Sequence, residues 1–210
     1  MKPNYYLDLK VKNTELNIPF AEGIPPALVL ITGKIVNIFH AFNKQKNENK
    51  IALSLPEYSK EKYRKIGYCF RFFVEERDLL DDLVEYFENN SFIEKHFDIR
   101  GVKKVNKEKI IKYSAFISKK IPRRLQEING LYNGLNTENY IDRCEYLHAL
   151  PNFRLKSTTN GNTFTLFIDI KNTSYMEDKE GKLKNDKGYL NSYGFSTNKK
   201  PIYLPDFKRD

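Results

Sequence analysis

Residues 66–88, IGYCFRFFVEERDLLDDLVEYFE, contain two different hydrophobic periods in one stretch. From Ile66 to Val74 every second residue is apolar or aromatic, which is the period of a strand with one buried face. Beyond Val74 the apolar residues recur three and four positions apart with acidic residues between them, as in an amphipathic helix. These apolar residues are Leu79, Leu80, Leu83, Val84 and Phe87. The stretch therefore predicts a strand followed by a helix.

The flanking segments extend this pattern in both directions. Residues 5–11 alternate as a half-buried strand, and Pro25-Pro26 begin a helix that should reach about Phe42. Residues 51–55 predict a short strand that ends at Pro56, and residues 97–105 predict another strand. The predicted order is β-α-β-β-α-β, which is the ferredoxin-like pattern in an α+β protein.

The second half of the chain is less regular. The Lys-rich segment 103–120 is strongly basic, and short helices are expected at 122–128 and 137–148. Strands 153–157 and 164–170 flank Asn160-Gly161, a strong hairpin signal. Residues 171–188 are charged and predict a loop, followed by strands at 189–196 and 202–207. We expect residues 1–105 to form the ferredoxin-like domain and residues 106–210 a smaller C-terminal α/β region that packs against it.

The composition favours a nucleic-acid partner inside the cell. The chain has 36 Lys and Arg against 27 Asp and Glu, a formal charge of +9, and 29 Phe and Tyr in 210 residues. Basic proteins rich in aromatic side chains suit unstacked RNA bases. Cys69 and Cys144 are isolated, and the sequence has neither a signal peptide nor an apolar run long enough to span a membrane. We expect a cytoplasmic protein.

The sequence predicts no metal site and no cofactor. It contains no phosphate-binding glycine loop, dinucleotide fingerprint or metal-ligand spacing, and its acidic pairs fall on the solvated side of a helix. RNA can be cleaved without a metal when a base removes the 2′-hydroxyl proton, and histidine suits that role. The candidates His40, His96 and His148 lie far apart in the sequence.

His40 stands apart from the other two histidines. On a helical wheel it lies opposite the apolar stripe of Ile31, Ile35, Ile38, Phe39 and Phe42, so we expect it outside the core. From the residues alone it can be a general base or an ordinary surface histidine. His96 lies among charged residues and His148 near a helix end, where a cation suits the helix dipole.

Three segments together resemble the pre-CRISPR-RNA processing endoribonucleases of subtype I-F systems. The first combines the strand YYLDL at 5–9, the Pro-Pro helix, His40 and the segment IALSLP at 51–56. The second is LKSTTNGNTFTLFI at 155–168, which is similar to the family's hairpin. The third is SYGFS at 192–196. The resemblance implies a protein that grips a CRISPR repeat stem-loop and cuts at its 3′ base.

The resemblance also implies roles for individual residues. His40 is similar to the general base, Ser157 to the residue that holds the attacking ribose, and Tyr193 to the side chain that orients the histidine. Thr159 replaces a family serine, and Phe164 resembles the aromatic that stacks on the last base pair of the stem. The remaining RNA-binding candidates lie in or beside the basic segment: Ser118, Lys119, Lys120, Arg123 and Arg124.

Our leading interpretation is therefore a metal-independent endoribonuclease. It would leave a 2′,3′-cyclic phosphate and stay on the hairpin as one subunit of a type I-F effector complex, being monomeric when alone. Two alternatives remain: a related capping subunit that binds the hairpin without cutting it, and a generic basic RNA-binding ferredoxin-like domain. Convergence of His40, Ser157 and Tyr193 in space would favour the nuclease.

Overall fold

The computed structural model describes residues 1–12, 26–46, 48–60, 66–119, 144–157, 159–174, 188–197 and 200–207. These residues form a mixed α+β structure with two antiparallel sheets. The first sheet has the strand order β2-β3-β1-β4, and the short strand β5 also pairs with β1. Its strands are β1 (Tyr5–Val11), β2 (Ala52–Ser54), β3 (Cys69–Val74), β4 (Phe97–Ile99) and β5 (Lys103–Lys104).

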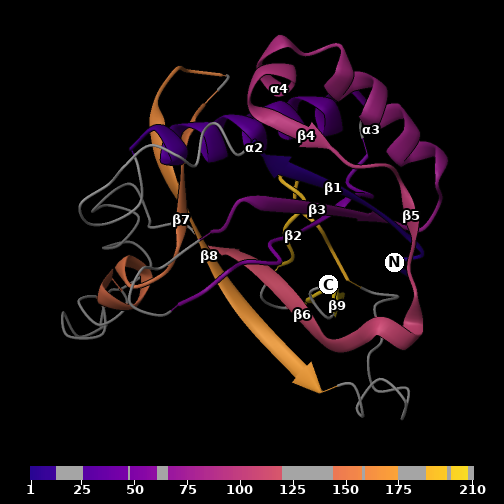
Figure 1. The fold of residues 1–210 in the computed structure, drawn as a ribbon. Helices are drawn as coiled ribbons and strands as arrows, with labels where there is room; N and C mark the ends of the chain where they lie inside the picture. The colour runs from indigo at the N-terminus through magenta and orange to yellow at the C-terminus, as the bar shows by residue number, and fades with distance from the viewer. Residues whose placement is uncertain are drawn as a thin grey trace.

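Three helices accompany the first sheet. They are α2 (Pro26–Lys46), α3 (Asp78–Glu88) and α4 (Ser91–His96), and all lie on one side of it in Figure 1. Helix α2 continues one turn beyond the predicted end at Phe42, with Lys44 and Lys46 in the last turn, where cations complement the helix dipole. None of the described helices is long and apolar enough to cross a membrane.

The predicted strand and helix at residues 66–88 are confirmed as β3 and α3. The predicted single strand 97–105 is wrong, because it is interrupted between β4 and β5. The helix α4 was missed. Its signal is Asn90, whose side-chain oxygen accepts hydrogen bonds from the first-turn amides of Phe92 and Ile93.

The second sheet contains β6 (Ile110–Lys119), β7 (Asn152–Lys156), β8 (Thr163–Ser174) and β9 (Leu204–Phe207) in the order β7-β8-β6-β9. A single 3₁₀ turn, η1 (Lys107–Lys109), leads into β6. The predicted hairpin is confirmed, with Leu155 opposite Phe164. Strand β8 reaches Ser174, so the predicted loop 171–188 is wrong for its first four residues.

Strand β6 was missed because its burial does not alternate. Residues 114–117 are buried in succession, and lysines lie on both sides of them in the sequence. The predicted strand 189–196 is instead a turn with isolated bridges at Leu190 and Ser196. Helix 144–148 belongs to the predicted helix 137–148, whose earlier residues lie outside the described ones, as does the predicted helix 122–128.

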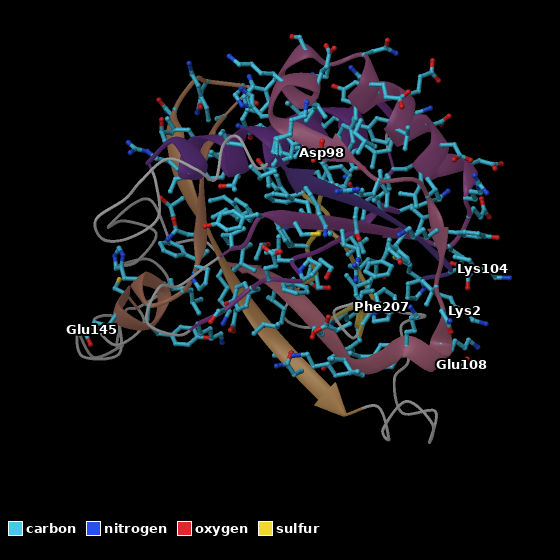
Figure 2. The ribbon with its side chains drawn as sticks, in the orientation of Figure 1. Lys2, Asp98, Lys104, Glu108, Glu145 and Phe207 are labelled. Carbon is cyan, nitrogen blue, oxygen red and sulfur yellow. The ribbon has the colours of Figure 1, made fainter. Side chains whose placement is uncertain are left out.

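One hydrophobic cluster joins the two halves of the chain. Phe39 of α2 and Phe70 of β3 belong to the same buried cluster as Phe153 of β7, Leu166 of β8 and Phe195. Helix α2 approaches β7 so closely at Gly33 that a Cβ there would overlap the carbonyl oxygen of Arg154. Figure 2 shows the interior between the sheets filled by side chains, while Lys104 points outward. The core thus positions the second sheet against α2.

Candidate active site

His40 is buried in the last third of α2, with 7% of its surface exposed. The prediction that it lies outside the core is wrong. The helix face opposite the apolar stripe is covered by residues 191–195, from the other end of the chain: Tyr193 contacts His40, and Asn43 bonds to Ser192. Helical periodicity predicts the one apolar face of α2. It cannot predict that a segment about 150 residues later in the chain covers the opposite face.

A turn at residues 191–194 determines where Tyr193 lies. The Asn191 side-chain oxygen accepts hydrogen bonds from the backbone amides of Tyr193 (2.9 Å) and Phe195 (3.1 Å). Gly194 has φ +77°, a conformation that glycine adopts at little cost, and its amide donates to the Asn191 carbonyl. The Gly194 carbonyl accepts from the Leu53 amide at 2.8 Å, which ties the turn to β2.

Two aromatic side chains, Tyr193 of this turn and Phe164 of β8, lie in series against the histidine. The rings of His40 and Tyr193 are stacked, 4.2 Å between centroids and 15° between planes. Phe164 meets Tyr193 edge-on at 6.4 Å, so the hairpin reaches the same place. His40 Nδ1 lies 3.4 Å from the Ser192 carbonyl oxygen. A carbonyl only accepts, so a hydrogen bond here requires the proton of neutral His40 on Nδ1, which leaves the lone pair on Nε2.

The hairpin holds the other predicted residues. The Ser157 amide donates to the Asn162 carbonyl at 2.8 Å, and the Gly161 amide donates to the Ser157 carbonyl at 3.0 Å, so Ser157 is fixed where β7 ends. Its place is two residues beyond Leu155, the strand partner of Phe164. Thr159 is exposed in the loop. The structure therefore brings His40, Tyr193 and Phe164 into contact and fixes Ser157 on the same hairpin.

Comparison with protein families matches residues 18–207 to the family described as CRISPR-associated protein (Cas_Csy4). The chain belongs to this family. The resemblance to the subtype I-F pre-CRISPR-RNA processing endoribonucleases is thereby confirmed, and membership in the Csy4 family implies binding and processing of CRISPR repeat RNA. Comparison with curated proteins finds no match.

Two of the RNA-binding candidates of this Csy4-family protein already bind other side chains. The Ser118 hydroxyl accepts a hydrogen bond from the Asn191 side chain at 2.7 Å, which supports the turn that carries Tyr193. Lys119 forms an ion pair with Asp169 at 2.8 Å and lies over the Tyr146 ring. Lys120, Arg123 and Arg124 lie outside the described residues.

Asp169 is buried and lies at the centre of a polar cluster whose other members are partly exposed. It also binds Lys60 at 2.6 Å and accepts a hydrogen bond from the Tyr146 hydroxyl at 2.6 Å. Burial by itself would raise the pKa of the Asp169 carboxyl, but the hydrogen bonds from Lys119, Lys60 and Tyr146 outweigh it and hold that pKa below its usual range. For Lys119, burial lowers the pKa and the bonds to Asp169 and Tyr146 raise it, with a net increase. Lys119 is thus bound within the protein.

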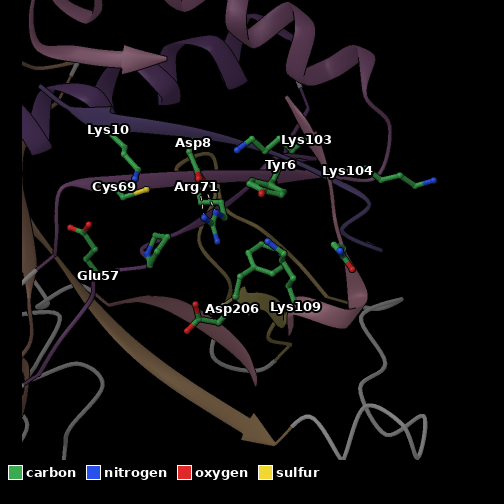
Figure 3. A pocket seen from close by; sticks show the side chains of 13 residues that line it. Tyr6, Asp8, Lys10, Glu57, Cys69, Arg71, Lys103, Lys104, Lys109 and Asp206 are labelled. Atoms are coloured by element: carbon green, nitrogen blue, oxygen red, sulfur yellow. Dashed lines mark hydrogen bonds and ion pairs between the residues drawn. The ribbon is translucent and has the colours of Figure 1, made fainter. Parts of the chain in front are cut away.

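A hollow of about 560 Å³ lies on the face of the first sheet that Figure 3 shows, bounded by β1, β3 and β9. Its described lining is basic overall, with four lysines and one arginine against three carboxylates. Arg71 binds Asp8 through two bonds of 2.6 and 2.9 Å, and it lies over the rings of Tyr6 and Phe207. This hollow contains no histidine among the described residues that line it. We therefore place the candidate active site at His40.

The other two histidines and Cys69 have other neighbours. His96 contacts Phe92 and His148 contacts Phe167. Burial, followed by the nearby Asp8 carboxylate, raises the pKa of the Cys69 thiol to about 12, which makes it a poor nucleophile. Among the residues that the structure describes, no group of three or more His, Cys, Asp or Glu side chains is placed to hold a metal ion.

Sequence reasoning missed two residues of the site, Asn43 and Asn191. Asn191 had a readable signal, because Asn-Ser-Tyr-Gly is typical of a turn in which the first side chain caps the following amides. The alternation of residues 189–196 favoured a strand and hid that signal. Asn43 had none, because its partner Ser192 is 149 residues away.

Proposed function

We propose that this protein cleaves a CRISPR repeat stem-loop at its 3′ base without a metal ion, and that it remains bound to the hairpin afterwards. The observation that carries the proposal is the stacked pair of His40 and Tyr193, with the Ser192 carbonyl at Nδ1. In this arrangement Nε2 is the nitrogen that can accept a proton. A neutral imidazole held in one tautomer is what a general base requires.

His40 removes the proton from the ribose 2′-hydroxyl next to the scissile phosphate. The 2′-oxygen then forms a bond to phosphorus, and the bond from phosphorus to the 5′-oxygen breaks. The leaving 5′-oxygen takes a proton from water, and protonated His40 returns its proton to water. The products are a 2′,3′-cyclic phosphate and a 5′-hydroxyl end. Tyr193 holds the plane of the imidazole, and Ser157 holds the attacking ribose so that its oxygen approaches in line.

The hairpin supplies the surface for the RNA. Phe164 stacks on the last base pair of the stem. Its edge-on contact with Tyr193, which itself stacks on His40, then places that base pair next to the general base. Thr159, exposed in the loop, contacts the sugar-phosphate backbone of the RNA. Lys120, Arg123 and Arg124 bind RNA phosphates. Ser118 and Lys119 instead bind protein side chains, Asn191 and Asp169, that support the RNA-binding surface.

We further propose that the first half has the ferredoxin-like fold, with a division from the C-terminal region after residue 105. The strand order β2-β3-β1-β4 supports this assignment, as does the element order β-α-β-β-α-β once α3 and α4 together are taken as its second helix. The protein then acts as one subunit of a type I-F effector complex, holding the mature RNA by its 3′ hairpin.

The test is incubation of the full chain with its cognate repeat RNA in excess EDTA. We expect cleavage to persist and to leave a 2′,3′-cyclic phosphate and a 5′-hydroxyl. A 5′-phosphate product, or activity that returns only with a divalent ion, would refute the mechanism. A parent protein that binds the hairpin tightly and never cuts it would instead be a capping subunit.

His40→Ala should lower the single-turnover rate by about 10²–10⁴. Because His40 is buried against Tyr193, this change also leaves a cavity and should lower stability, which the loss of an exposed histidine would not do. His40→Asn keeps more of the volume and should lose as much rate. Hairpin affinity and thermal unfolding are measured beside the rate for both variants.

A further inference from the structure

Asn43 lies one helical turn after His40 and is buried, with 2% of its surface exposed. Its side-chain nitrogen donates a hydrogen bond of 3.0 Å to the Ser192 carbonyl oxygen. The same oxygen lies 3.4 Å from His40 Nδ1. A carbonyl oxygen has two lone pairs, so it can accept from both side chains at once. Asn43 and His40 are thus joined through one backbone atom.

The other end of the Asn43 amide is unsatisfied. Its side-chain oxygen is buried and has no hydrogen-bond partner within the described parts of the chain. A buried acceptor without a partner is unfavourable, and an apolar side chain of similar size would avoid that penalty. The donor bond to the Ser192 carbonyl stabilises the turn, and the unsatisfied oxygen offsets part of that gain. The contact of Asn43 that bears on the site is therefore the hydrogen bond that its side-chain nitrogen donates to the Ser192 carbonyl.

Stacking on Tyr193 leaves one feature of the catalytic ring undetermined. A flat contact of 4.2 Å with an interplanar angle of 15° constrains the plane of the imidazole. It does not decide which edge of the ring faces the protein, since a half-turn about the Cβ–Cγ bond keeps the plane. The Ser192 carbonyl distinguishes the two edges, because it accepts only from a protonated nitrogen.

We propose that Asn43 is a positioning residue, which holds the Ser192 carbonyl toward His40 Nδ1 and so keeps the proton there and the lone pair on Nε2. The inference rests on the proposed role of His40 as general base. Without the amide donor, the carbonyl at the tip of the turn loses its second bond to α2 and can rotate away from the ring. The neutral histidine then divides between its two tautomers, and only one of them presents Nε2 as the base.

The tautomer is measured directly by long-range ¹H–¹⁵N correlation on protein labelled with ¹⁵N at histidine, without RNA. The chain has three histidines, and His96→Gln and His148→Gln variants assign the His40 signals. The parent should show His40 protonated at Nδ1. A parent protonated at Nε2 overturns the proposal before any Asn43 variant is made.

Asn43→Leu removes the donor and keeps most of the volume. We expect mixed tautomers and a single-turnover cleavage rate lower by about 2- to 13-fold, the population change that one net hydrogen bond supplies. Hairpin affinity should stay within about twofold, because Asn43 is buried beneath the site. Asn43→Gln retains an amide donor and should recover part of both effects.

The matched control is Thr32→Val, on the same helix. Thr32 is buried, and its hydroxyl donates to the Val29 carbonyl within α2, away from His40. This variant should keep the parent tautomer and rate. Asn43→Leu with the parent tautomer and the parent rate would show that Asn43 is a structural tie and overturn the proposal. A parent that never cleaves refutes the proposed function, while the tautomer measurement still decides the role of Asn43.

Discussion

Gly194→Ala should be among the most damaging single-methyl changes in this protein. The glycine has φ +77°, where an alanine is less stable by about 1 kcal/mol. A Cβ at this position would also lie 2.8 Å from Phe39 Cε1, 3.0 Å from the Ile51 carbonyl oxygen and 3.0 Å from Leu53 Cβ. Phe39 is fully buried and the Ile51 oxygen belongs to the backbone, so neither yields easily. Overpacking of this kind costs about 1–3 kcal/mol, which gives a total of about 2–4 kcal/mol.

Alanine variants of two other glycines separate the cost of the backbone conformation from the cost of overpacking. Gly161 has φ +69°, but a Cβ added there would lie 4.0 Å from its nearest neighbour, Lys156 Cε. Gly161→Ala should therefore lose only the conformational part, about 1 kcal/mol. Gly101 has neither a positive φ nor an atom within 4 Å of such a Cβ, and its alanine variant should be nearly neutral. The three variants form a graded series.

The free energy of unfolding of each variant is measured by urea denaturation, and single-turnover cleavage is measured beside it. Gly194→Ala should also cut more slowly than Gly161→Ala, because the strain falls next to Tyr193. Equal stability of the Gly194 and Gly161 variants would refute the close packing of the turn against Phe39 and Leu53. If Gly194→Ala has the parent's stability but no longer cleaves, the turn relaxes around the added methyl group and displaces Tyr193.

Three further outcomes are expected. Tyr193→Phe should keep the stacked ring and cut within a few-fold of the parent, whereas Tyr193→Ala should lose about tenfold or more; equal losses in single-turnover assays would assign the role to the hydroxyl. Asp169→Asn should lower the free energy of unfolding by about 1–3 kcal/mol at pH 7. Because the folded-state pKa of Asp169 is lowered, the difference in the free energy of unfolding between the parent and Asp169→Asn should shrink as pH falls below about 4. Urea denaturation at several pH values tests this. Neutralising Lys120, Arg123 and Arg124 together should lower the slope of log Kd against log salt by about one per lost phosphate contact; an unchanged slope would place the RNA elsewhere.

The structure also changes which lysines belong in such an experiment. Lys119 was predicted to bind RNA, but its ammonium is bound to Asp169 and Tyr146, and only 26% of its side chain is exposed. Replacing it would leave the buried Asp169 carboxylate without one of its cations and lower stability, which would obscure any effect on RNA affinity. A charge count along the sequence treats all lysines alike, because it does not include their partners.

Local patterns in the sequence determined the order of the elements in the first half. The alternation at residues 66–74 and the helical spacing at 79–87 became β3 and α3, because each period matches one backbone geometry with one buried face. Asn160-Gly161 likewise indicated the hairpin of β7 and β8, and Gly161 lies at φ +69° in the connection between these strands. The resemblance in three segments was enough to indicate the family.

Tertiary structure decided the chemistry of the site. His40 was expected at a surface and is buried, because residues 191–195 cover a helix face whose own sequence carries no sign of them. Strand β6 was hidden because both of its faces are partly covered, which removes the alternation on which strand prediction depends. The bonds that join Asn43 and His40 to the Ser192 carbonyl link positions about 150 residues apart. Sequence periodicity reports which face of an element is apolar, while the identity of the atoms that meet there depends on how distant elements pack.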